Sequence, residues 1–193
     1  HVAHMSGGDF YGSELSTNMQ QDDVLKVEFV SASGDTTVLA RDVAVSQGEI
    51  VDAAFMSKKA LCDFYAEQIA GTEDGVLFSL HLKATMMKVS DPIIFGHAVK
   101  AYYKDAFAKH GALFDQLGVD ANNGIGDAYE KIKSLPADQQ AAVKADLDAC
   151  FEAGPDMAMV DSDRGISNLH VPSDIIVDAS MPAASRESGK MWA

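Results

Sequence analysis

The feature that most constrains the fold is a short apolar run that ends in a lysine. Residues 76–82 read Val-Leu-Phe-Ser-Leu-His-Leu and are followed by Lys83. The run is apolar on both faces, which is typical of a strand covered by helices on both sides. It is far shorter than the ~20 residues that a membrane-spanning helix needs. We therefore expect residues 76–82 to form the central strand of an α/β fold, with no membrane segment.

Alternating apolar and polar residues predict a β-hairpin near the N-terminus. Residues 24–30 alternate, a turn containing Gly34 follows, and residues 36–39 supply the second strand. Before it, the Gly/Ser-rich residues 1–23 are expected to be a loop. The chain is thus divided into a loop (1–23), the hairpin with its connection (24–48) and an α/β core (49–193), all within one piece of a domain.

Helical spacing of apolar residues dominates the rest of the chain. Asp91 is expected to cap a helix whose first turn contains Pro92. Helices and strands alternate, so the fold class is α/β. The expected helices are residues 49–70, 91–118, 124–134 and 136–153, and a short strand is expected at 157–160.

Charge and cysteine content exclude several classes of protein. Lysine and arginine number 15 against 29 acidic residues, which gives a formal net charge of −14. A cationic footprint for the phosphate backbone is therefore missing, and we expect no nucleic-acid partner. Cys62 and Cys150 lie far apart without a CxxC pattern, which favours reduced core residues in a cytosolic protein over a disulfide or a zinc site.

Lys83 has two interpretations from its position alone. Ligands of open α/β sheets bind outside the carboxyl ends of the strands, where a half-desolvated lysine could act as an acid or base. Most lysines are surface residues, so a solvated lysine at a strand end fits the pattern as well.

Asp178 also has two interpretations. It interrupts the apolar residues 175–181, and Asp174 lies four positions earlier, on the same face if the segment is helical. Two carboxylates on one face suit a hard cation such as Mg²⁺. The alternative is an amphipathic helix with Asp174 as its N-cap.

Other motifs carry no chemistry. Residues 161–165 (Asp-Ser-Asp-Arg-Gly) begin like a calcium loop but lack its later ligands, which predicts a turn. Gly124-Ile125-Gly126 lacks the third glycine of a dinucleotide fingerprint and is expected to open a helix. The histidines have no metal-ligand spacing and are expected to be structural; they are His81, His97, His110 and His170.

Several longer strings make the sequence resemble a known family. The chain resembles the monomeric, NADP-dependent isocitrate dehydrogenases of bacteria, and the resemblance covers nearly its whole length. The resemblance implies an isocitrate/isopropylmalate dehydrogenase-like α/β fold, of which this chain would be part of the large domain. The strings are Gly8-Asp9-Phe10-Tyr11-Gly12-Ser13-Glu14, residues 78–97, Asn122-Asn123-Gly124-Ile125-Gly126, residues 168–182 and Gly189-Lys190-Met191-Trp192.

The resemblance also implies a reaction and two site residues. The family decarboxylates isocitrate oxidatively to 2-oxoglutarate with NADP and Mg²⁺ or Mn²⁺, and the cation stabilises the enolate left when CO₂ departs. By motif match, Lys83 is the catalytic and substrate-binding lysine that assists proton transfer at the substrate hydroxyl. Asp178 is one metal-ligating carboxylate by the same match.

Other parts of the family's site are expected outside this chain. The upstream substrate motif, the catalytic tyrosine, the further metal-binding aspartates and the NADP 2′-phosphate clamp do not occur in it, so we assign it no cofactor-binding residue. The chain is expected to be an excised piece of a cytoplasmic enzyme, inactive by itself, whose site the remainder of the parent chain completes. The alternative is a non-catalytic α/β scaffold or binding module that descends from such an enzyme.

Overall fold

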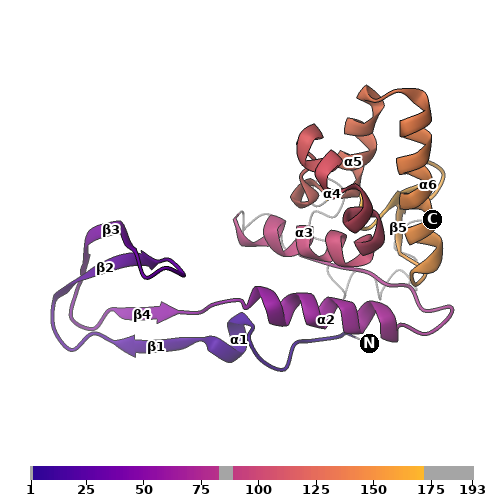
Figure 1. Ribbon diagram of the computed structural model, residues 1–193. Coiled ribbons are helices and arrows are strands. Elements are labelled where there is room, and N and C mark those ends of the chain that lie inside the picture. The colour runs from indigo at the N-terminus through magenta and orange to yellow at the C-terminus, as the bar shows by residue number, and fades with distance from the viewer. Residues whose placement is uncertain (1, 83–88, 172–193) are drawn as a thin grey trace. The chain divides into compact units, whose positions relative to one another are not determined.

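The computed structural model describes residues 2–82 and 89–171. The chain divides into two compact units, one formed by residues 4–60 and the other by residues 61–193 with 1–3. The helices and strands are labelled in Figure 1.

The unit 4–60 is built on two antiparallel strand pairs. The predicted hairpin is confirmed, and its strands are longer than expected: β2 (Asp23–Val30) pairs with β3 (Thr36–Val45), with bulges that shift the register. The turn between them is closed by a hydrogen bond from Ser31 N to Asp35 O of 2.9 Å. The second pair is β1 (Leu15–Asn18) with β4 (Ile50–Ala53).

Two expectations for this unit are corrected. Residues 1–23 are not all loop, because they contain β1 and the single-turn helix α1 (Phe10–Ser13), capped by the Asp9 side chain. Residues 50–53 belong to β4 and not to the predicted helix 49–70, which begins only at Lys58 as α2 (Lys58–Gly71). The β-branched Ile50 and Val51 favour the extended conformation and face Asn18 and Thr17 across the ladder.

Helices dominate the described part of the second unit. The predicted helix 91–118 is present but broken at Tyr103 into α3 (Ser90–Tyr102) and α4 (Lys104–Leu117). The next two predicted helices are confirmed as α5 (Ile125–Lys131), continued by the 3₁₀ turn η2 (Ile132–Ser134), and α6 (Ala137–Ala153). A 3₁₀ turn, η1 (Ala121–Asn123), precedes α5. The largest fully buried side chains are Phe95, Val99, Tyr103, Ile125, Val143, Leu147, Asn168 and Leu169.

The predicted central strand is wrong. Residues 76–82 form no strand; Phe78 alone makes an isolated parallel bridge, to Met157. Val76 and Leu77 are 50% and 57% exposed, so the run is not covered on both faces. The segment beside it forms its strand pairing with a different partner. The predicted strand at 157–160 appears as β5 (Met159–Asp161), and β5 pairs with β6 (Ile166–Ser167).

The fold therefore mixes helices and strands, which is consistent with the α/β class. Among the residues described, no helix has the length and apolar character needed to cross a membrane.

Candidate functional site

Both predicted site residues lie outside the described residues. Lys83 falls in the gap 83–88, and Asp178 falls in 172–193 together with Asp174. The structure does describe the two segments that lead to them in sequence. We call the contact between residues 78–82 and residues 168–171 the junction.

Asn168 forms the centre of the junction. Its side-chain Oδ1 accepts a hydrogen bond from Leu80 N (2.6 Å), and its Nδ2 donates one to Leu80 O (3.0 Å). Its own backbone N–H donates to Ala158 O at 2.9 Å. The Asn168 side chain thus takes the place that a neighbouring strand would occupy beside Leu80.

Phe78 supplies two further hydrogen bonds of this segment. Its N–H donates to Asp156 O (2.7 Å), and its carbonyl accepts from Ala158 N (2.9 Å). Residues 78–80 are therefore held first by the backbone of residues 156–158 and then by one side chain.

The start of α5 holds the other side of the junction. Ile125 N and Gly126 N donate to Leu169 O and His170 O, each at 3.0 Å. A Cβ atom at Gly124 would lie 2.1 Å from His170 O, and one at Gly126 would lie 2.6 Å from the His170 ring. These two glycines are needed because the backbones approach too closely for any side chain.

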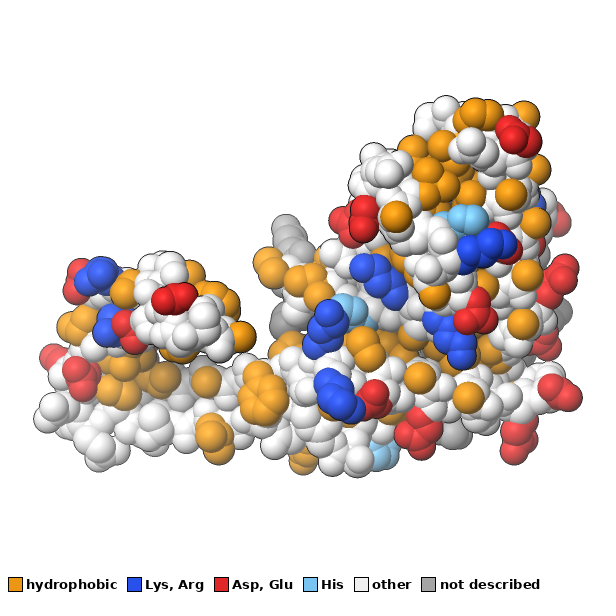
Figure 2. Space-filling view, in the orientation of Figure 1, with side chains coloured by type: hydrophobic (Ala, Val, Ile, Leu, Met, Phe, Trp, Pro, Cys, Tyr) orange, Lys and Arg blue, Asp and Glu red, His pale blue; other side chains and the backbone are white. Residues whose placement is uncertain are grey.

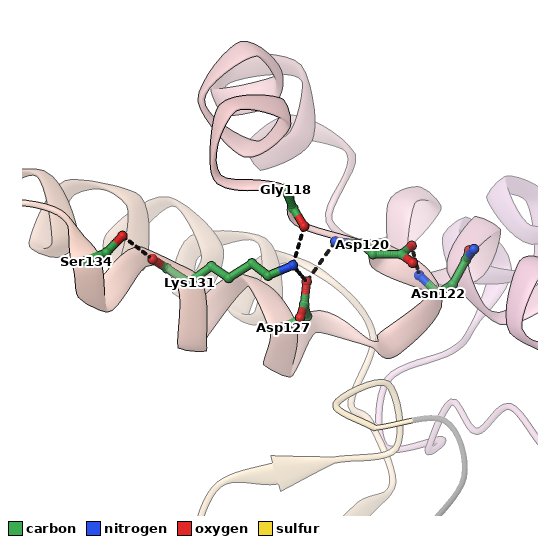
Figure 3. A network of polar contacts seen from close by, with 6 residues as sticks. All are labelled: Gly118, Asp120, Asn122, Asp127, Lys131 and Ser134. Atoms are coloured by element: carbon green, nitrogen blue, oxygen red, sulfur yellow. Dashed lines mark hydrogen bonds and ion pairs between the residues drawn. The ribbon is translucent and has the colours of Figure 1, made fainter.

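A polar network fixes the turn that precedes α5 (Figure 3). Asp127 Oδ2 accepts from Asp120 N (2.7 Å) and pairs with Lys131 Nζ (2.9 Å), which also donates to Gly118 O. Asp120 Oδ1 accepts from Asn122 N at 2.9 Å. The network holds residues 118–124 in place. These residues lead directly into the start of α5, whose backbone N–H groups bind Leu169 and His170.

His170 is partly buried beside α5. Its ring stacks on Tyr129 with centroids 5.9 Å apart and an interplanar angle of 11°. The Tyr129 hydroxyl donates to Asp148 Oδ1 on α6 at 3.1 Å. Burial lowers the pKa of His170, so the neutral imidazole is the favoured form.

Asp91 is a buried carboxyl group that the sequence analysis placed differently. It is not the N-cap of α3, which is Val89 without a side-chain cap, but lies inside the first turn. The residue is 7% exposed, and its Oδ2 has no hydrogen-bond partner among the residues that the structure describes. Burial raises the pKa of Asp91, because the charged form is the more costly one to bury.

The expectations for residues 161–165 and for the glycines before α5 are confirmed. Residues 162–165 are the turn between β5 and β6, with Gly165 at φ 69°. Gly124 precedes α5 directly, after η1 rather than after a strand. Cys62 and Cys150 are free thiols. Across residues 2–82 and 89–171, no three His, Cys, Asp or Glu side chains gather where they could hold a metal ion.

His110 and His81 also have polar neighbours. His110 Nε2 lies 2.6 Å from Asp146 Oδ2 and so joins α4 to α6, where Lys109 binds the same carboxylate. His81 Nε2 lies 2.6 Å from the Ser79 hydroxyl, within the segment that leads to Lys83.

Asn168 and Asp91 are the residues that reasoning from the sequence missed. Asn168 begins one of the strings that carry the family resemblance, and Gly124 and Gly126 lie in another. The two strings are in contact at the junction. Their presence together in one sequence was therefore the signal that could have indicated this contact. Nothing in the spacing of residues indicates that an amide side chain pairs with Leu80.

Comparison with known proteins gives a consistent result. The sequence model of a family described as "Monomeric isocitrate dehydrogenase" matches residues 1–193. The chain is 59% identical over 193 residues to "Isocitrate dehydrogenase [NADP] 2" of Colwellia maris and 58% identical to the protein of that name from Mycobacterium tuberculosis. It is 54% identical to "Isocitrate dehydrogenase [NADP]" of Azotobacter vinelandii. In each comparison all of this chain is covered but only 26% of the relative, so the chain spans about a quarter of their length.

Proposed function

Because this chain belongs to the monomeric isocitrate dehydrogenase family, we propose that it is a segment of an enzyme that oxidatively decarboxylates isocitrate to 2-oxoglutarate with NADP. The observation that carries the proposal is the similarity of the entire chain to proteins named as NADP isocitrate dehydrogenases. The finer assignments are an isocitrate/isopropylmalate dehydrogenase-like large domain, of which this is part, and a cytoplasmic location.

Lys83 is proposed as the catalytic and substrate-binding lysine. A lysine next to the substrate hydroxyl can take up the hydroxyl proton as the alcohol is oxidised and can return a proton later. The support is the sequence string 78–97 that contains it, together with the fixed position of Leu80 three residues before it.

Asp178 is proposed as one carboxylate ligand of Mg²⁺ or Mn²⁺. A bound divalent cation supplies Lewis-acid stabilisation of negative charge on the substrate oxygens. The described residues themselves do not form a metal centre. The proposal therefore rests on the oxygen chemistry of Asp178 and on the string 168–182, and we derive no step through the cation.

The reaction needs parts that these 193 residues do not supply. Gly124-Ile125-Gly126 is not a dinucleotide fingerprint, because it follows a 3₁₀ turn and opens a short helix. The NADP site and the remaining metal ligands are therefore proposed to come from the rest of a longer polypeptide, and the 193-residue chain alone is expected to be inactive.

The test is substitution of Lys83 in the full-length enzyme. We expect Lys83→Met to lower kcat by about 10²–10⁴-fold with a smaller change in the KM for isocitrate, because proton transfer acts mainly in the transition state. Lys100→Met, which removes an exposed lysine of α3, is the matched control and is expected to keep normal kcat. The measurement is the absorbance of NADPH formed from isocitrate and NADP.

The same assay applied to the 193-residue chain tests the claim that it is a segment. No turnover is expected, and binding of Mg²⁺ measured by calorimetry should be weak, on the order of millimolar, because few protein ligands replace the cation's waters. Turnover by the chain alone would refute the segment assignment. A Lys83→Met enzyme that keeps most of its kcat would instead support a solvated surface lysine.

A further inference from the structure

We propose that Asn168 is a positioning residue for Lys83, an inference that rests on the proposed function. Asn168 holds the backbone three residues before Lys83 through both polar groups of Leu80. It does so from the segment that continues in sequence toward Asp178. One buried side chain thus connects the two stretches of chain that carry the proposed site residues.

The geometry of Asn168 leaves one arrangement of its amide group. The Leu80 N–H requires an acceptor and the Leu80 carbonyl requires a donor, so the amide oxygen and nitrogen must face them in this order. Asn168 is 0% exposed, and its own N–H is bound to Ala158 O. Water therefore has no access to replace the side chain, and the pair of hydrogen bonds needs a side chain that accepts from one group and donates to the other.

Leu80 needs this anchor because no strand ladder holds it. The backbone pairing of residues 76–82 with the 156–158 segment ends at the isolated bridge of Phe78. Leu80 is bound next by Asn168, across 88 positions of sequence. Both backbone polar groups of Leu80, three positions before Lys83 in the sequence, are therefore held by a single side chain.

The Asn168 backbone is itself well supported. Leu169 O and His170 O, directly after it, accept hydrogen bonds from Ile125 N and Gly126 N at 3.0 Å. The turn before α5 is in turn ordered by Asp127 and Lys131 (Figure 3). Asn168 therefore transmits the position of a helix-supported backbone to the segment before Lys83, and an error of about 1 Å at a reacting group can cost about 10²-fold in rate.

The experiment compares Asn168→Asp and Asn168→Leu in the full-length enzyme. An ionised carboxylate accepts from Leu80 N–H but cannot donate to Leu80 O, whereas a protonated carboxyl group does both, as the amide does. We expect kcat of Asn168→Asp to fall at least about 10-fold at pH 8, with a smaller change in KM. Relative to wild type, this deficit should shrink as the pH is lowered. Asn168→Leu should show a deficit that does not change with pH.

Ser167→Ala is the matched control. Ser167 is the preceding residue and is also buried, at 3% exposed, but both hydrogen bonds to the Leu80 backbone come from Asn168. Its kcat and pH profile are expected to match wild type. Hydrogen exchange at the Leu80 amide gives a readout besides activity, and it should be faster in Asn168→Leu than in Ser167→Ala.

Each outcome decides the proposal. A folded Asn168→Leu enzyme with wild-type kcat would overturn it, and so would an Asn168→Asp deficit that is the same at every pH. If Asn168→Leu fails to fold, the Asn168→Asp series alone decides, because that substitution preserves the side chain's size and shape. If the wild-type enzyme shows no turnover, the proposed function fails and this inference fails with it. That outcome is seen in the wild type itself, whereas failure of the inference alone is seen only in the variants.

Discussion

His170 is a single side chain whose protonation state follows from its surroundings. The ring is partly buried and stacks on Tyr129, so the charged form of the imidazole loses hydration. Its pKa in the folded chain therefore lies below the ordinary histidine value of about 6.5. As the pH falls through that value, the unfolded chain binds the proton more readily, and the free energy of unfolding decreases.

We predict that an NMR titration of the 193-residue chain gives His170 a midpoint below about 6.5. Tyr129→Ala should move the midpoint back toward this value, because it uncovers one face of the ring. A wild-type midpoint at or above 6.5 would show that the imidazole is hydrated or paired with an acid in solution.

Asn168 and Asp91 show what sequence patterns miss at the scale of residues. A buried asparagine and a buried aspartate both look like surface or capping residues in a sequence, since polar side chains are mostly exposed. Asn168 is buried where it meets Leu80, 88 positions away in the sequence, and Asp91 lies inside the first turn of α3 instead of capping it. Lys83 and Asp178 were found only through the family resemblance, and their placement stays a prediction.

At the scale of elements, local periodicity predicted the helices well and the central strand badly. Helix α6 and the β2–β3 hairpin are stabilised by bonds close in sequence, so a short window contains their signal. A strand needs a partner from elsewhere in the chain, and an apolar run does not reveal whether one exists. Residues 76–82 form one backbone bridge, at Phe78, and Leu80 is bound by the Asn168 side chain instead of by a second strand. The apolar pattern there therefore does not produce a strand.

The approach of α5 to the junction makes a prediction about Gly124. Its φ is 87°, and an added Cβ would lie 2.1 Å from His170 O, a backbone atom that cannot turn aside. We expect Gly124→Ala to lower the free energy of unfolding by at least about 1–3 kcal/mol, the typical cost of such a backbone conformation for a residue other than glycine.

Gly111→Ala is the control for that substitution. Gly111 lies inside α4 with open space around its Cα, so alanine should stabilise the helix by up to about 1 kcal/mol. Urea unfolding followed by circular dichroism measures both variants. Equal stability of Gly124→Ala and wild type would mean that the contact between α5 and residues 169–170 does not persist in solution.

At the scale of the whole molecule, the two units differ in how much apolar surface they bury. Residues 4–60 bury a single apolar side chain, Val45, while Phe29, Leu39 and Ile50 are 55–68% exposed. Figure 2 shows hydrophobic side chains on the visible surface of the hairpin β2–β3. The second unit buries a cluster drawn from α3, α4, α5 and α6. Two-stranded pairs without a covered face are marginally stable in water.

We therefore predict that hydrogen exchange in the 193-residue chain is fastest in β1–β4 and β2–β3 and slowest in α3 and α6. Exchange measured by mass spectrometry on short peptides resolves these elements. The amides of β2 and β3 are hydrogen-bonded within the pair, so rapid exchange there would reflect opening of the unit and not missing bonds. Equal protection of β2 and α3 would contradict this prediction. It would show that the apolar side chains of the hairpin, of which Val45 alone is buried in the structure, are covered in solution.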